Sequence, residues 1–527
     1  MKENLEETLH KVFQKTKDSF GYVPLNSVSL SKENPTAWIN MQDFKVCVNP
    51  DFINKLSEKM SYEDAIEGVL DHEFGHYLFH PYSLSRVILE SVAIKDKENG
   101  ESLRQFYDDV NDNLRVLISK NNSQLPNVYK TLSPQSKVEK TLTAFYNYKL
   151  GKDFGDVKLD KECEKAFESL KNIDFLGQKN GRIEFVKQSD KQNKNDLLKF
   201  HQIMNPLYEQ DKKDGKTPQN PMGESPQLDD YTGKQIRKAL KELIEKGQIS
   251  NEDAKGFIKK QTKKFSEEGD FPGGKYLNNP DSFANRFLYE SLAGKYSITL
   301  KKTPLLAKDG VYPTRHEKFE VGDDLNSLDP FNSYGGKVLP GLSNKWVKEN
   351  LKYHGQKEAT PNLMILLDDS GSMPNPTEKI SNAVLGSFAV ANEYLKNGAK
   401  ISVGRFSDRT TMQDFTNDKY SVLDELLKFK SGGDTVVDLN VVKKVSKGIY
   451  DLVLITDGQI GNRDKVLEYM NSHIQNGARA YVIEIGNHNE TYNEGKVKII
   501  PISSEEDIGK IILDEVHKYN ANVGAKK

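Results

Sequence analysis

The chain has 527 residues, of which 29% are charged and 36% hydrophobic, and its formal net charge is −2 at pH 7. This length favours at least two domains, because a single hydrophobic core rarely serves so many residues. The near-neutral charge gives no sign of a nucleic-acid partner, and no apolar run approaches the roughly 20 residues of a membrane span.

Targeting and redox features favour the cytoplasm. The first residues, Met1–Glu7, lack the apolar core of a signal peptide. The two cysteines, Cys47 and Cys163, could form one disulfide at most, and two isolated thiols are typical of a reducing compartment. We therefore expect a cytoplasmic protein that binds neither a membrane nor nucleic acid.

Residues 1 to about 125 have the pattern of a compact α+β unit. A helix is predicted near Leu5–Lys17, and Phe44–Asn49 alternates as a half-buried strand ended by an Asn-Pro pair. A long helix should follow, because Ser61 begins a helix-capping pattern and apolar residues recur at helical spacing over Ala65–Phe79. The most informative motif of the chain lies inside this helix.

That motif is His72-Glu73-Phe74-Gly75-His76, which has the form H-E-x-x-H. Two histidines four residues apart lie on one side of a helix, so both imidazoles can bind one zinc ion. Glu73 can act as the general base of peptide hydrolysis, taking a proton from water and passing it to the leaving amine. A chance match is the alternative, but the upstream strand could hold an extended peptide by edge pairing, as in zincin-type metallopeptidases. A zinc site that has lost peptidase activity is a further alternative.

Zinc needs a third protein ligand, for which the sequence offers three candidates. His80 lies about 80° further round the helix than the first histidine of the motif and near the helix end, so it would reach the metal awkwardly. A second helix over Leu103–Leu117 places Asp109 at the edge of its apolar stripe, whereas Asp108 and Asp112 point to solvent on the helical wheel. We favour Asp109, with Asp112 as the fallback and His80 as the other alternative. The remaining interpretation is that Asp109 and Asp112 are surface charges.

The middle of the chain carries no catalytic motif. Residues 208–232 are polar and proline-bearing, as in a linker or mobile loop, and helices rich in Lys and Glu are predicted over Ile236–Lys246 and Ala254–Phe265. Phe283–Tyr296 has the pattern of an amphipathic helix stopped by glycine, and a strand is predicted over Ser297–Leu300. About 50 irregular residues follow, and we expect them to wrap the C-terminal domain.

The C-terminal part alternates between strand and helix patterns. Five consecutive apolar residues, Leu363–Leu367, bounded by turn formers, predict a strand covered on both faces. The elements expected after it are helices over 383–395, 422–429, 465–474 and 505–519 and strands over 401–406, 452–455, 480–485 and 497–502. This alternation predicts a parallel, doubly wound α/β sheet.

Oxygen-bearing side chains follow the strands of this predicted sheet. Asp368, Ser370 and Ser372 come directly after the first strand, where open α/β sheets place their ligands. A glycine-rich loop supplies Thr435, and Asp457 ends a later strand. The string D-x-S-x-S alone often marks only a tight turn, but three such loops in order predict a site for magnesium or manganese, which prefer hard oxygen ligands.

These three loops resemble the metal-ion-dependent adhesion site of von Willebrand factor A domains, over roughly residues 355–525. The resemblance implies that magnesium is touched by the hydroxyls of Ser370, Ser372 and Thr435 and held, directly or through water, by Asp368 and Asp457. It also implies an open position for a carboxylate of a protein partner. In the usual pattern threonine follows glycine directly, whereas Asp434 intervenes in this sequence.

The two motifs together resemble those of a prokaryotic family assigned as metallopeptidases with a von Willebrand A-like domain, whose members often work with MoxR-type AAA+ ATPases. We accordingly divide the multidomain chain into a zincin-like α+β domain at 1–200, a polar linker and helical segment at 201–280, a framing segment packed on the C-terminal domain at 281–354, and a von Willebrand A-like, Rossmann-like domain at 355–527. No loop of the form G-x-x-x-x-G-K-[ST] occurs, so an ATPase would be a separate protein.

The function predicted from the sequence is a zinc-dependent metallopeptidase whose A domain binds a partner or substrate through a magnesium-bound carboxylate. The first alternative is a non-proteolytic adaptor or chaperone-like protein in which zinc is structural. The second is a metal-chelatase component, because some chelatase subunits carry an A domain beside an AAA+ motor. The H-E-x-x-H motif argues against the chelatase.

Overall fold

The structure, a computed structural model, divides by residue contacts into two compact units, Met1–Ala284 and Asn285–Lys527. It describes residues 2–502 except 22, 42, 82, 177, 180–181, 184–188, 217, 219–221, 223–225, 267–278, 295–302, 307–309, 330–338, 352–355, 447, 449, 475–478 and 486–490. The four-part division expected from the sequence is finer than these two units and stays a prediction.

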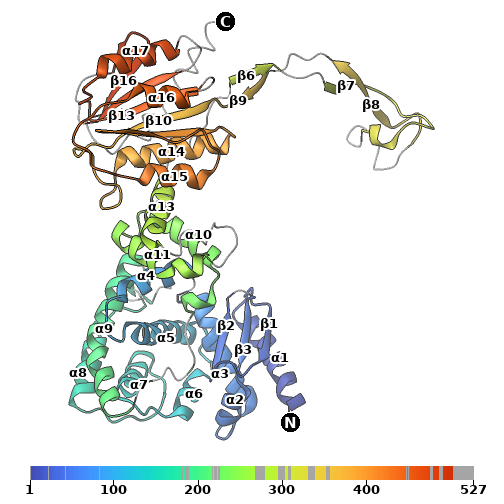
Figure 1. The fold of residues 1–527 in the computed structure, drawn as a ribbon. Helices are drawn as coiled ribbons and strands as arrows, with labels where there is room; N and C mark the ends of the chain where they lie inside the picture. Colours follow the sequence, from blue (N-terminus) through green and yellow to red (C-terminus); the bar gives the residue numbers. More distant parts are fainter. Residues whose placement is uncertain are drawn as a thin grey trace. The chain divides into compact units, whose positions relative to one another are not determined.

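The first unit begins with a helix and a small sheet (Figure 1). Helix α1 (Lys2–Ser19) precedes the strands β1 (Ser27–Leu30), β2 (Ala37–Asn40) and β3 (Lys45–Val48). The central strand β3 is parallel to β1 and antiparallel to β2, so β2 has a free edge. The strand expected over 44–49 is therefore the central one, and its neighbours were not predicted because four-residue strands show little alternation.

Two long helices, both predicted, pack together in the first unit. Helix α3 (Tyr62–Leu78) begins after Ser61, whose hydroxyl accepts a hydrogen bond from the backbone N–H of Asp64 at 3.1 Å. Helix α5 spans Gly100–Ser119. Every residue of α3 from 65 to 76 is buried, so its polar side chains face other elements instead of water.

The remaining described α-helices of the first unit pack against this pair or against one another. They are α2 (Pro50–Ser57), α4 (Leu84–Ile94), α6 (Leu125–Leu132), α7 (Lys137–Leu150), α8 (Lys161–Leu170), α9 (Asp190–Lys213), α10 (Gly233–Glu245) and α11 (Asn251–Ser266). Part of the expected linker over 208–232 is helical, because α9 extends into it. Within that part, Asp211 is buried and accepts hydrogen bonds from the backbone N–H groups of Lys137 and Val138.

The second unit is built on a seven-stranded mixed sheet with the order β12-β11-β10-β13-β14-β16-β15. The strands are β10 (Asn362–Asp368), β11 (Ile401–Phe406), β12 (Thr410–Met412), β13 (Tyr450–Thr456), β14 (Ala480–Ile485), β15 (Tyr492–Glu494) and β16 (Val497–Ile502). The five long strands are parallel, as predicted. The edge strands β12 and β15 run antiparallel to their neighbours β11 and β16. They were not predicted because each has only three residues.

Helices cover both faces of this sheet (Figure 1). The α-helices in the described part of the second unit are α14 (Asn382–Lys396), α15 (Lys419–Leu427), α16 (Leu439–Val445) and α17 (Arg463–Ile474), and α13 (Pro280–Ala293) leads into the unit. Six of the seven residues of β10 are buried, which confirms a strand covered on both faces. The strand expected over 297–300 and the helix expected over 505–519 lie outside the described residues.

The stretch expected to be irregular contains two antiparallel strand pairs. Strand β6 (Thr303–Leu306) pairs with β9 (Gln356–Ala359), and β7 (Gly310–Lys318) pairs with β8 (Asn344–Leu351). The register of β7 and β8 shifts next to Pro313. The prediction of irregular structure was wrong because two-stranded ribbons consist of edges only, and edges and bulges accept proline.

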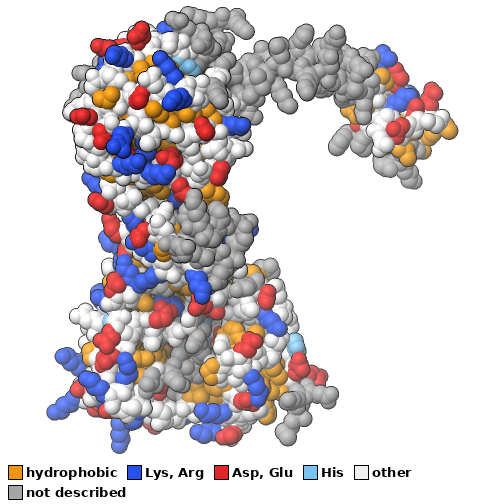
Figure 2. Space-filling model, viewed as in Figure 1, with side chains coloured by type: hydrophobic (Ala, Val, Ile, Leu, Met, Phe, Trp, Pro, Cys, Tyr) orange, Lys and Arg blue, Asp and Glu red, His pale blue; other side chains and the backbone are white. Residues whose placement is uncertain are grey.

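The described surface carries mixed charge. On the face shown in Figure 2, Lys and Arg side chains are interspersed with Asp and Glu, in agreement with the formal net charge of −2. No helix in the described part of the chain is both long and apolar enough to cross a bilayer. Cys47 and Cys163 are buried free thiols.

A buried ion pair offers a test of the second unit. Arg405 of β11 contacts Asp369 at 2.7 Å, and each side chain is 4% exposed. Asp369→Ala would leave the guanidinium buried without its carboxylate, so the free energy of unfolding should fall by about 3–5 kcal/mol in urea denaturation. In the control Glu317→Ala, which removes an exposed pair with Arg315, the loss should stay below about 1 kcal/mol. Equal losses in the two variants would contradict this view of the core.

Candidate metal centres

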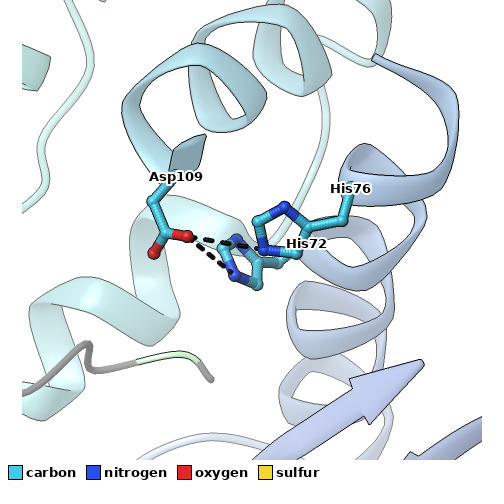
Figure 3. A group of neighbouring side chains, drawn as sticks. All are labelled: His72, His76 and Asp109. Carbon is cyan, nitrogen blue, oxygen red and sulfur yellow. Dashed lines mark ion pairs between the residues drawn. The ribbon is translucent and has the colours of Figure 1, made fainter. Parts of the chain in front are cut away.

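His72 and His76 of α3 face Asp109 of α5 (Figure 3). Their Nε2 atoms lie 3.8 and 3.4 Å from Oδ1 of Asp109, and all three side chains are buried. These separations are longer than a normal hydrogen bond. They are close to the roughly 3.3 Å that separates two ligand atoms of a tetrahedral zinc ion with bonds of about 2.0–2.1 Å. The three side chains could hold a metal ion.

The other ring nitrogen of His72 is held by an amide. Its Nδ1 lies 2.9 Å from Oδ1 of Asn113, and the amide nitrogen of Asn113 donates to the hydroxyls of Tyr129 at 2.7 Å and Tyr146 at 3.0 Å. Because the N–H groups of Asn113 are used in this way, its oxygen accepts from Nδ1 of His72. Nε2 of His72 therefore keeps its lone pair for a metal.

The other ring nitrogen of His76 is held by a carboxylate. Its Nδ1 pairs with Asp112 and lies 3.2 Å from the backbone oxygen of His80. Burial lowers the pKa of His76, but Asp112 and Asp109 outweigh it and raise that pKa well above its usual value. For His72 burial prevails and lowers the pKa to about 4. A metal ion would therefore bind His72 in its neutral form, and its binding would displace the proton from Nε2 of His76.

Several buried polar atoms in this group have no hydrogen-bond partner among the described residues. They are Nε2 of His72, Nε2 of His76, and both carboxylate oxygens of Glu73 and of Asp109. Each such group costs about 1–3 kcal/mol unless something satisfies it. A cation would satisfy the two imidazoles and Asp109 together. Burial raises the pKa of Glu73 to about 8 in the absence of that cation. A bound cation would lower this pKa again and favour the ionised carboxylate, which can accept a proton.

The predicted alternatives to Asp109 have other positions in the structure. Asp112 lies behind His76, and His80 contacts Glu90 at 2.9 Å and Asp108 at 3.1 Å. The expectation that Asp108 and Asp112 point to solvent was wrong, since both are fully buried. The helical wheel identified one apolar face, whereas α5 also packs against α4, α7 and α9 on its other sides.

His80, Glu90 and Asp108 form a second buried group that could hold a metal ion. This group, however, contains a cation of its own, because Arg104 lies 2.5 Å from Asp108 and 3.8 Å from Glu90. The contacts of His80 are of hydrogen-bond length. Burial lowers the pKa of His80, but Glu90 and Asp108 raise it above its usual value. A protonated His80 and Arg104 neutralise the two carboxylates, so the charges of this group balance without an ion, while Nδ1 of His80 and Oε2 of Glu90 have no hydrogen-bond partner among the described residues.

The loops after β10 and β13 meet at the switch point of the C-terminal sheet, where β10 lies between β11 and β13 and an open α/β sheet binds its ligands. Asp368 accepts hydrogen bonds from the hydroxyl of Thr456 at 2.7 Å and from the backbone N–H of Ser370 at 2.9 Å. The hydroxyls of Ser370 and Ser372 are 3.0 Å apart, and Ser372 donates to Asp457. Four predicted oxygen ligands therefore lie together.

The fifth predicted ligand, Thr435, follows a loop that runs beside these four. Ser370 forms a parallel β-bridge with Gly432, and the backbone N–H of Gly371 donates to the carbonyl of Gly432 at 3.0 Å. Thr435 is half-buried. The structure thus places Thr435 on the neighbouring loop, without a hydrogen bond from its hydroxyl to the other four ligands among the described residues.

Comparisons with known proteins add little to this geometry. No family model and no curated protein matches the chain. Among solved structures, the chain is similar to an aerotolerance-related membrane protein from Bacteroides fragilis NCTC 9343, with 14% identity and a TM-score of 0.22 over 30% of this chain and 100% of that one. A TM-score this low supports no conclusion about fold or function.

Gly75 sets the distance between α3 and α5. A Cβ atom at this position would lie 2.9 Å from Cγ2 of Val116 and 3.3 Å from Cβ of Asp112. Cβ atoms in folded proteins hardly ever come within 3.0 Å of another non-bonded atom, so an added side chain would force a neighbour to move. The missing side chain therefore lets α5 bring Asp109 close to the two histidines.

The variant Gly75→Ala should lower the free energy of unfolding by up to about 2 kcal/mol, because overpacking costs about 1–3 kcal/mol and helix propensity returns about 1 kcal/mol. Gly256→Ala in α11 is the matched control, since the nearest atom to an added Cβ is Nζ of Lys95 at 4.0 Å. There only propensity acts, and stability should rise by up to about 1 kcal/mol. Urea unfolding of both variants measures the difference, and a stabilised Gly75→Ala variant would disprove the close packing.

Proposed function

We propose that the first unit is a zinc-dependent metallopeptidase and that the second is a von Willebrand A-like domain which binds a protein carboxylate through magnesium. The observation that carries the proposal is the buried group of two imidazoles and one carboxylate whose facing atoms have no hydrogen-bond partner among the described residues. Two nitrogen ligands and one oxygen ligand at tetrahedral spacing suit zinc, and three protein ligands leave a fourth position open.

The roles of the residues follow from their positions. His72 and His76 would hold zinc through Nε2, and Asp109 would hold it through its carboxylate. When bound, zinc supplies a Lewis acid that polarises a peptide carbonyl and lowers the pKa of water. Glu73 would take a proton from the attacking water on a carboxylate oxygen and deliver it to the leaving nitrogen. Asn113 would act as a positioning residue that keeps the His72 ring in its metal-binding tautomer.

The edge strand β2 supports a peptide substrate. One side of β2 pairs with β3, and its other side is the end of the sheet. Strand β2 also contacts α3, the helix that carries the H-E-x-x-H motif. An extended peptide could pair along this edge through main-chain hydrogen bonds, which bind peptides with little dependence on sequence.

The second half of the proposal rests on the oxygen group after β10 and β13. Asp368, Ser370, Ser372 and Asp457 would hold magnesium, or manganese, with Thr435 from the adjacent loop. A hard cation with few direct carboxylates stays electrophilic and binds a carboxylate supplied by a partner. The resemblance noted from the sequence makes a separate MoxR-type AAA+ ATPase the partner we propose first, and the cytoplasm the compartment.

One observation favours the adaptor as a second candidate function. His72 and Glu73 are no more than 1% exposed, so the site is closely enclosed. Structural zinc sites are closed, whereas catalytic sites keep an open position. An adaptor would use zinc to hold α3 against α5 and would act through its A domain alone.

The first test separates these two functions. Zinc-loaded Glu73→Gln should retain about one zinc per chain and lose peptide cleavage by about 10²–10⁴-fold, because the variant keeps the ligands and lacks the base. Asp109→Ala should lose zinc, because it removes one of three protein ligands. Metal analysis and cleavage of a peptide library, read by mass spectrometry, measure both effects.

The control for this test is Glu90→Gln, which changes the His80 group. This variant should still bind zinc at His72, His76 and Asp109, because Glu90 is not one of those ligands. Full zinc occupancy in Asp109→Ala would remove Asp109 from the ligands. Cleavage by Glu73→Gln at the wild-type rate would end the peptidase assignment, and zinc binding without any cleavage in wild type would favour the adaptor.

The second test concerns the A domain. Asp368→Ala should abolish magnesium-dependent capture of the partner ATPase, because Asp368 is the most buried carboxylate of the oxygen group. Glu468→Ala, which changes an exposed acid of α17 in the same unit, should leave capture unchanged. Pull-down with purified ATPase, with and without a chelator, is the measurement. Capture that resists both the chelator and Asp368→Ala would refute the magnesium-bridged contact.

A further inference from the structure

The first unit contains a cleft of about 500 Å³, and one of its walls is Asp109. This volume is within the range of about 300–1,000 Å³ that is usual for ligand pockets. The large apolar side chains that line the cleft are Phe52, Phe106, Tyr129, Leu132, Leu142 and Tyr146. They come from four helices, α2, α5, α6 and α7, so the lining is held by rigid elements.

The charged groups of the cleft are one lysine, Lys55, and three carboxylates, Asp51, Glu139 and Asp109. Asp51 is already paired with Lys32 at 2.6 Å outside the lining, and Glu139 caps the start of α7. The excess of carboxylates would repel an anionic ligand group, whereas an apolar group would lose its water shell against aromatic and aliphatic walls.

The cleft borders the candidate zinc site. Asp109 belongs to both, and the tyrosines that line the cleft accept hydrogen bonds from Asn113, which in turn holds His72. Pro35 and Thr36, directly before the edge strand β2, line the same cleft. A peptide paired along β2 presents every second side chain to one face of the sheet.

We infer that this cleft binds an apolar side chain, aromatic or long aliphatic, of the peptide residue beside the bond that is cleaved. The inference rests on the proposed peptidase function. It assigns to the enzyme a preference for apolar residues near the reacting bond, set by the walls of the cleft. Burial of a Phe or Leu side chain relative to Ala corresponds to about a 10- to 100-fold preference.

A half-buried leucine of the wall offers a variant that fills the cleft. Leu132→Trp places a larger ring in the wall, and Leu159→Trp is the matched control, because Leu159 is also half-buried against the same core and does not line the cleft. The probes are short alanine peptides that carry one Phe, Leu, Ala or Asp at each position in turn. Binding to zinc-loaded Glu73→Gln protein is measured by calorimetry, with and without each Trp substitution, and kcat/KM is measured for proteins that retain Glu73.

We expect peptides with Phe or Leu to bind about 10- to 100-fold more tightly than those with Ala or Asp, and only Leu132→Trp to remove the difference. The same binding pattern without cleavage would support the binding of apolar side chains in the cleft and would overturn the peptidase assignment. Cleavage without apolar preference, or equal effects of the two Trp substitutions, would overturn the cleft and leave the peptidase standing. Neither binding nor cleavage would overturn both.

Discussion

The structure of the first unit depends on ionisable side chains that are buried between α3 and α5. Charged groups in a protein interior must be paired or bound to a metal, because the free energy of removing them from water is large. Around His80, Arg104 supplies a positive charge beside the carboxylates of Glu90 and Asp108. Around His76 no arginine forms an ion pair with the neighbouring carboxylates among the described residues. Burial keeps His72 neutral and raises the pKa of Glu73 to about 8, so a protonated His76 faces two carboxylates, Asp109 and Asp112. A cation is the simplest way to balance the second carboxylate.

The two candidate metal sites differ in their exposure, and this difference fits the separate roles that we propose. The nitrogen and oxygen group of the first unit is buried, and its facing atoms have no partners within the described residues. The oxygen group of the second unit is satisfied by its own hydroxyls, and Ser372 is exposed. A shielded site strengthens electrostatic effects on a bound substrate, whereas an exposed site at a sheet tip can accept a side chain from another protein.

Local patterns explain what could be predicted from the sequence. The H-E-x-x-H helix was found because its cap and its apolar spacing lie within one segment, and the long parallel strands were found because each is a short segment rich in apolar residues. Glu90, Arg104 and Asn113 were not predicted, because no motif marks them and they reach the site from other turns and helices. The burial of Asp108 and Asp112 was missed for a related reason. A helical wheel ranks the faces of one helix, but only the fold decides whether a second layer of helices covers the polar face.

The cleft determines how the enclosed candidate metal group can act. Glu73 is 1% exposed, so a peptide cannot reach it across an open surface. Asp109 is the member of the group that also lines the cleft, and a substrate approaching from there would meet apolar walls before it met the ligands. If an apolar side chain fills those walls, its binding energy can position the neighbouring peptide bond, which is how remote contacts contribute to catalysis. If the cleft stays empty, the same group can only hold α3 to α5. Occupation of the cleft is therefore the physical difference between a peptidase and an adaptor with a structural zinc.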